Sequence, residues 1–192
     1  MGPPSNGQVL CGITKLSQRS QLTETSLKRL VQALRERYRF IFLATSGSGW
    51  TVDDPEIDQA ALRLAARILV VVRQDVEGIT LARRALQDWP RHQQVRVVLN
   101  QVGLPDQVSR RDVEAKLLAP VVAELPFDPW KVAEARARNR PVVCQRGSRL
   151  APGLINLANR IVGGRIQLPP DEQARTNAWW QRLPVAVTGA LR

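Results

Sequence analysis

The residue types that carry phosphate and metal chemistry are sparse in this sequence. A phosphate-binding loop needs glycines, a lysine and a hydroxyl in the order GxxxxGK[ST], because its backbone N–H groups and its lysine hold the phosphates. No glycine is followed by lysine anywhere in the 192 residues. The single histidine, His92, and the isolated Cys11 and Cys144 do not have the spacing of a metal site or a nucleophile triad. We therefore predict no catalytic residue and no metal ligand.

The charge of the chain has two interpretations. The formal net charge is +11, and the 28 basic residues include only four lysines. Arginine dominance of this kind can reflect coding bias alone. Alternatively, it indicates an anionic partner, either DNA or an acidic membrane surface. The arginines are spread along predicted helices rather than gathered in a basic tail. Their distribution therefore does not distinguish coding bias from an anionic partner.

The elements that would position any site follow an alternating pattern. Four apolar runs of β-strand type alternate with helical segments, at residues 40–44, 68–72, 95–99 and 121–125. This order is typical of an α/β protein, with a mainly parallel sheet covered by helices on both faces. A run at 9–13 is a candidate short edge strand.

The predicted helices have recognisable ends. Thr23 is a candidate N-cap for a helix whose apolar positions recur at i, i+3, i+4 and i+7, and Ser109 is a candidate cap for another. Gly163 and Gly164 mark the end of the last helix of the body. With these two included, helices after the first are predicted at about 56–66, 77–89, 109–118, 130–139 and 150–162.

The length fits one main domain with a sizeable core. We divide the chain into a flexible N-terminus at 1–7, an α/β body at 8–163 and a linker with a short tail at 164–192. The N-terminus lacks the apolar segment of a secretory signal, no run approaches a membrane span, and the two cysteines stand alone. These features predict a cytoplasmic protein.

The tail contains Trp179 and Trp180, followed by Arg182. These residues could pack back on the body, dock on a partner, or lie on a membrane surface. The sequence leaves the three alternatives open.

The order of the segments resembles the C-terminal two-thirds of the MinD/ParA class of P-loop ATPases. Within that class it resembles the CpaE/TadZ-like branch of pilus-assembly and localisation proteins. The resemblance covers residues 8–162 and is carried by several short motifs. These are Arg37-Tyr-Arg-Phe-Ile-Phe-Leu43 ("RYDYVVVD"), Ala66-Arg-Ile-Leu-Val-Val-Val72 ("ADRVLLVT"), Val97-Val-Leu-Asn100 ("VLNR"), Glu124-Leu-Pro-Phe-Asp128 ("xLPxD") and Arg138-Asn-Arg-Pro-Val142 ("INRGRPL").

The sequence departs from this family where phosphoryl transfer takes place. The family's phosphate loop would precede residue 8, and its magnesium-supporting carboxylate corresponds to Ala44, which cannot hold a metal. Asp53 and Asp54 follow nine and ten residues later and are better explained as capping or solvated charges. The resemblance therefore implies a catalytically inert protein without a cofactor, in which ATP binding is weak or lost.

Two positions match residues that lie near the purine in the family. Asn100 and Pro126 are the candidates for such vestigial adenine contacts, or they simply end a strand and shape a turn. The family's first strand would lie between the strands at 40–44 and 68–72. Without it, these two strands must pair directly, or another chain must fill the gap, because exposed strand edges are a liability.

The function that the resemblance implies is a scaffold or localisation protein for pilus or secretion assembly, or for cell-pole or septum positioning. Its partners would be proteins of such a machine, in a homo- or heterodimer, at the inner face of the membrane. One alternative is an ATPase whose phosphate loop comes from a missing or separate N-terminal segment. The other is a nonspecific DNA-binding partition protein.

Overall fold

The computed structural model describes residues 10, 22–45, 55–87 and 94–163. The chain divides into two compact units, one of residues 1–41 with 169–192 and one of residues 42–168. Of the predicted strand at 9–13 only Leu10 is described, without a strand assignment, and the tail residues Trp179, Trp180 and Arg182 lie outside the described residues. The second unit contains the sheet.

Helix α1, Glu24–Arg35, begins where its capping residues predict. The Thr23 side chain accepts a hydrogen bond from the Ser26 backbone N–H at 3.1 Å, and the Ser26 hydroxyl accepts one from the Thr23 N–H at 2.8 Å. This capping box satisfies two backbone donors of the first turn. The apolar side of the helix buries Leu27 and Val31, as their spacing predicts.

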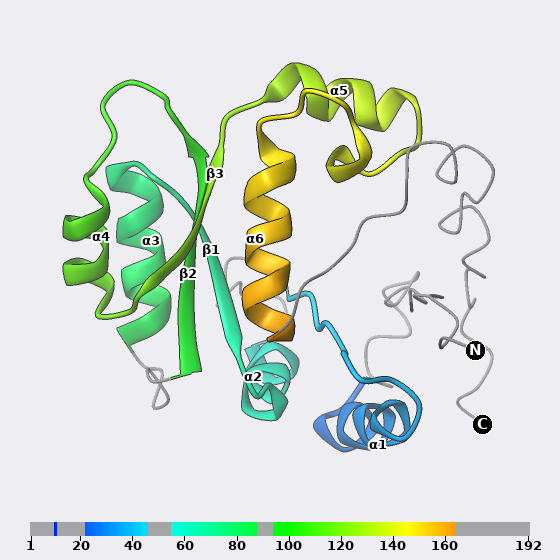
Figure 1. Ribbon diagram of the computed structural model, residues 1–192. Coiled ribbons are helices and arrows are strands. Elements are labelled where there is room, and N and C mark those ends of the chain that lie inside the picture. Colours follow the sequence, from blue (N-terminus) through cyan, green and yellow to red (C-terminus); the bar gives the residue numbers. More distant parts are fainter. Residues whose placement is uncertain (1–9, 11–21, 46–54, 88–93, 164–192) are drawn as a thin grey trace. The chain divides into compact units, whose positions relative to one another are not determined.

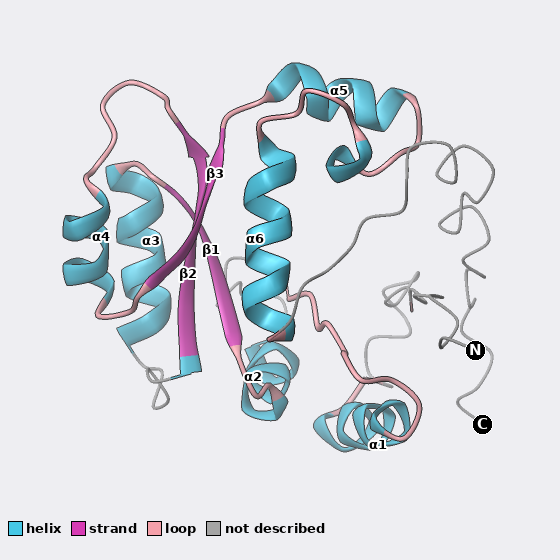
Figure 2. Ribbon diagram, viewed as in Figure 1, coloured by secondary structure: helices cyan, strands magenta, loops and turns pink. Residues whose placement is uncertain are grey.

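The sheet of the second unit is parallel, with the strand order β1-β2-β3 (Figures 1 and 2). Its strands are β1 at Ile68–Arg73, β2 at Val95–Val102 and β3 at Val121–Pro126. Parallel strands need crossover connections, which are usually helices. Helix α3, Val76–Gln87, lies between β1 and β2 in the sequence, and α4, Arg110–Leu117, lies between β2 and β3. The predicted parallel pairing is confirmed for these three strands.

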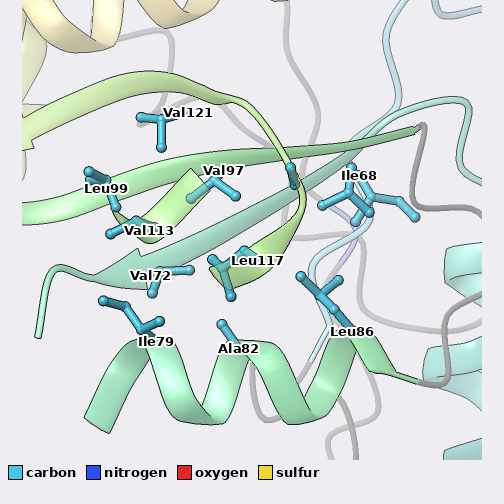
Figure 3. Packing of buried hydrophobic residues seen from close by; sticks show 12 residues of the cluster. Ile68, Val72, Ile79, Ala82, Leu86, Val97, Leu99, Val113, Leu117 and Val121 are labelled. Atoms are coloured by element: carbon cyan, nitrogen blue, oxygen red, sulfur yellow. The ribbon is translucent and has the colours of Figure 1, made fainter. Parts of the chain in front are cut away.

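One face of the sheet forms the larger core with α3 and α4 (Figure 3). Val95, Val97 and Leu99 of β2 are fully buried there, because they alternate along the strand and point to the same face. The facing helices contribute the buried residues Ile79, Ala82, Leu86, Val113 and Leu117.

The other face is covered by α6, Leu150–Val162, which packs mainly on β3. A Cβ at Gly153 would lie 3.1 Å from the Glu124 carbonyl oxygen, so the glycine permits this close approach. Gly163 ends the helix in the left-handed conformation, as predicted. Helices therefore cover both faces of the sheet, as the sequence pattern indicates. Helix α2, Pro55–Leu64, precedes β1, while α5, Pro129–Ala137, and the short η3, Val142–Cys144, connect β3 to α6.

The strand predicted at 40–44 is wrong. Residues 40–45 have no strand assignment, and Phe42 is 75% exposed. An apolar run forms a strand only where a neighbouring strand supplies hydrogen-bond partners. Among the described residues no strand pairs with the outer edge of β1, so the direct pairing considered for 40–44 and 68–72 does not form either.

Candidate functional site

The carboxyl ends of the three strands meet at one edge of the sheet, where ligands of open α/β sheets usually bind. The strand register places Asn100 of β2 between Arg73 of β1 and Leu125 of β3. Pro126 pairs with Val102 at the same edge. The structure therefore brings the two predicted adenine-contact residues, Asn100 and Pro126, to neighbouring strand ends.

Asp75 forms a compact polar cluster just after β1. Its Oδ1 accepts a hydrogen bond from the Gly78 N–H at 2.7 Å, and its Oδ2 accepts one from Arg73 Nε. The Gly78 hydrogen bond and the Arg73 guanidinium hold the pKa of Asp75 below its ordinary value. Arg73 also donates from Nη2 to Glu77 at 2.8 Å.

Gly78 allows the first turn of α3 to start against the end of β1. A Cβ at this position would lie 2.6 Å from the Arg73 carbonyl oxygen, closer than real Cβ atoms approach. The sequence alone does not explain why a glycine is needed at this position. The structure does, because the end of β1 packs directly against the start of α3.

Three amide side chains organise the loop after β2. Gln107 accepts a hydrogen bond from the Gly103 N–H at 2.9 Å and donates to the Gln101 carbonyl oxygen at 2.7 Å. Gln74 is buried and donates to the Val108 carbonyl oxygen at 2.8 Å. Asn100 Oδ1 accepts from the Gln101 N–H at 3.0 Å. Such contacts fit the strand-end interpretation of Asn100, and the adenine contact remains a prediction.

Asp128 joins the start of α5 to the start of α6. Its Oδ1 accepts a hydrogen bond from the Lys131 N–H at 3.4 Å, as the N-cap of α5, with Pro129 as the first helical residue. Its Oδ2 accepts from the Arg149 N–H at 2.9 Å and from the Ser148 hydroxyl at 3.4 Å. The Asp-Pro pair signals the cap in the sequence, but no sequence signal indicates the contacts 20 residues away.

Helix α4 also begins with its own cap. Ser109 Oγ accepts a hydrogen bond from the Asp112 N–H at 3.2 Å, which confirms the predicted cap. In each of α3, α4 and α5, the backbone N–H of the third helical residue therefore donates to the side chain just before the helix.

The remaining predicted site residues do not join this edge in the described structure. Ala44 lies in an exposed non-strand segment, whereas Asp53 and Asp54 lie outside the described residues. Among the residues with a described position, no group of three or more His, Cys, Asp or Glu side chains could hold a metal ion. Within that same part of the chain, no helix is long and apolar enough to cross a membrane.

Comparison with solved structures identifies the fold. The chain is similar to the MinD cell division protein of Aquifex aeolicus, with a TM-score of 0.62 and 20% identity over 78% of this chain and 65% of that one. It is also similar to a ParA family ATPase from Chlorobium tepidum, with a TM-score of 0.66 and 12% identity over 77% and 60%. A third similar structure is the septum site-determining protein MinD of Pyrococcus horikoshii, in complex with Mg-ADP, with a TM-score of 0.59 and 16% identity over 78% and 61%.

These likenesses show the fold alone. The chain spans about three-fifths to two-thirds of the length of the solved structures that it matches. No family model matches the sequence, and no curated protein sequence matches it significantly. The predicted α/β class and the MinD/ParA-like architecture are confirmed.

Proposed function

We propose that this chain is a catalytically inert localisation protein built on a MinD/ParA-like fold. It would act as a scaffold of the CpaE/TadZ type, in pilus or secretion assembly or in cell-pole or septum positioning. Two similar structures are a cell division protein and a septum site-determining protein, and one similar structure is a MinC:MinD complex. These likenesses support a positioning role that works through protein partners.

The observation that carries the proposal is the state of the two carboxylates at the carboxyl edge of the sheet. Phosphoryl transfer needs a carboxylate that supports magnesium and backbone N–H groups that cradle the phosphates. Both oxygens of Asp75 and both oxygens of Asp128 accept hydrogen bonds from the chain itself. A helix N-terminus binds an anion through its unsatisfied N–H groups. Here one such group in each of α3, α4 and α5 already has a side-chain acceptor.

The test is a phosphate-release assay on the full chain with ATP and Mg²⁺. We expect release equal to a blank without protein, while a MinD/ParA ATPase with an intact phosphate loop, assayed in parallel, turns over. Asp128→Asn can keep the α5 cap through Oδ1, but it removes the charge and the acceptor that faces Ser148 and Arg149. Turnover that survives repurification and is lost in Asp128→Asn would contradict the proposal.

A second candidate function follows from the outer edge of β1. A further strand from a preceding segment or a separate chain could pair there and bring a phosphate-binding loop to the carboxyl edge. The chain would then be part of an ATPase. If this alternative is correct, the chain alone shows no ATP turnover. Mg²⁺-dependent turnover appears only after the polypeptide that carries the phosphate-binding loop is added. If the chain is an inert scaffold, no ATP turnover is seen with or without the added polypeptide.

A further inference from the structure

The outer edge of β3 is closed at its start by two side chains of α4. On the inner side of β3, the Val97 N–H of β2 donates to the Pro120 carbonyl oxygen at 2.9 Å. The Val121 backbone bonds to α4 instead. Its N–H donates to Glu114 Oε1 at 2.8 Å, and its carbonyl oxygen accepts from Arg110 Nη2 at 2.8 Å. The two side chains therefore supply the acceptor and the donor that a neighbouring strand would supply.

The geometry of α4 explains why these two residues act together. Arg110 and Glu114 lie one turn apart on the helix, at i and i+4, so their side chains are neighbours. Arg110 Nε lies 3.4 Å from Glu114 Oε1, and Arg110 Nη1 donates to Glu124 Oε1 at 3.2 Å. Residues 118–120 return the chain from α4 to β3 (Figure 1). One guanidinium group thus joins two carboxylates and a backbone carbonyl group of the strand.

The exposure of this pair indicates what it contributes. The Arg110 side chain is 52% exposed and the Glu114 side chain 36% exposed. An ion pair this exposed contributes little to stability by itself. An unpaired row of strand N–H and C=O groups, in contrast, is a template on which another chain can add a strand. The pair therefore matters most for what the edge of β3 would bind without it.

Two further features protect the same strand. Proline has no N–H to offer a further strand, and β3 follows Pro120 and ends at Pro126. Helix α6 packs on β3, and a Cβ at Gly153 would lie 3.1 Å from the Glu124 carbonyl oxygen. Prolines, charged side chains and a covering helix are all means by which natural proteins protect sheet edges. All three are found on β3.

We propose that Arg110 and Glu114 form an edge guard, which prevents β3 from pairing with the β1 strand of a second copy of this chain. Among the described residues no strand pairs with the outer edge of β1, so each copy carries a strand that an open β3 edge would accept. Such head-to-tail pairing would continue the parallel sheet from copy to copy without closing, which leads to open filaments. The guard occupies the Val121 N–H and C=O, with which this pairing would begin.

The edge guard does not depend on the inertness proposed above, because self-association and phosphate release are separate measurements. It bears on the second candidate function instead. With β3 closed, an added strand can extend the sheet only at β1, which is the edge that a complementing polypeptide would use.

The test is sedimentation velocity of the full chain over a range of concentrations. Arg110→Ala/Glu114→Ala opens both Val121 groups and should self-associate at about tenfold lower concentration than the parent, the scale of one or two hydrogen bonds gained. Because head-to-tail pairing does not close, we expect species larger than a dimer. Glu114→Gln keeps an Oε1 acceptor without the charge and should sediment like the parent, whereas Glu114→Ala should associate.

A second measurement reports on the guard without association. In dilute samples the Val121 N–H should exchange with solvent faster in Glu114→Ala than in Glu114→Gln, because only the amide retains the acceptor. The matched control is Lys28→Ala/Glu24→Ala, which removes the exposed i,i+4 ion pair of α1, where Nζ and Oε1 lie 2.7 Å apart. Like the double variant on α4, it leaves the net charge unchanged, and it should sediment like the parent.

Circular dichroism establishes which variants fold. The proposal is overturned if folded Arg110→Ala/Glu114→Ala associates no more than the parent or than the α1 control. It is also overturned if Glu114→Gln associates as strongly as Glu114→Ala, since loss of charge would then be responsible. If the double variant does not fold, the Val121 exchange rates decide, and equal rates in Glu114→Ala and Glu114→Gln would overturn the guard.

Discussion

The carboxylate of Asp75 makes the stability of the protein depend on pH. Its pKa is held below the ordinary value, first by the Gly78 N–H and then by the Arg73 guanidinium. A carboxyl group with a lowered folded pKa contributes stability that is fully present above its unfolded pKa, about 3.9, and is lost as the pH falls through the folded pKa. We therefore predict that Asp75→Asn is less stable than the parent in urea unfolding above about pH 5. The difference should disappear in stronger acid.

The asparagine can still cap the Gly78 N–H through Oδ1, but it removes both the charge and the second acceptor, which faces Arg73. Asp106→Asn, on the exposed loop after β2, is the matched control, a carboxylate replaced by the same amide away from the Arg73 cluster. A constant difference between Asp75→Asn and the parent at all pH values would contradict the role given to the carboxylate charge.

At the scale of one element, the backbone is strained at Leu118, the residue that ends α4. Leu118 follows the helix with φ 50° and ψ 33°, the left-handed conformation, and its side chain is exposed. A residue with a Cβ is disfavoured there, whereas glycine is not. We predict that Leu118→Gly raises the free energy of unfolding by about 0.5 kcal/mol, after allowing for the greater freedom of glycine in the unfolded chain.

Leu118→Ala separates this effect from the loss of an exposed apolar side chain. It keeps the Cβ and should therefore gain nothing in a thermal melt. If alanine stabilises the protein as much as glycine does, the exposed leucine rather than the backbone conformation is responsible.

At the scale of the whole molecule, the two faces of the sheet differ in how far helices cover β1. Val97 of β2 is fully buried beneath α3 and α4, whereas Val71 of β1 points to the opposite face and is 61% exposed. We predict that Val97→Ala lowers the free energy of unfolding by about 2 kcal/mol, the cost of two lost methyl groups and a cavity. Val71→Ala should change it by less than about 0.5 kcal/mol.

The same substitution at both positions makes the comparison direct, with urea unfolding as the measurement. A large loss in Val71→Ala would show that another segment or chain covers β1 in solution. That result would favour the complemented ATPase over the isolated scaffold.

The sequence by itself determined the features that depend on local pattern. The apolar runs that alternate with helical segments predicted the parallel strands β1 to β3, because the composition of a run and its place in the order can be read from the sequence. The Thr23 and Ser109 caps and the Gly163 helix end followed for the same reason, since each depends on a few adjacent residues.

Only the tertiary structure decided which other parts of the chain each segment contacts. Residues 40–44 have the composition of a strand, but a strand needs a partner, and no local pattern shows whether one is present. Asp128 could be assigned as a cap from its neighbours, yet its contacts with Ser148 and Arg149 depend on where α6 begins. The exposure of Trp130 likewise depends on which side of α5 faces the body, because burial depends on the elements packed around a residue.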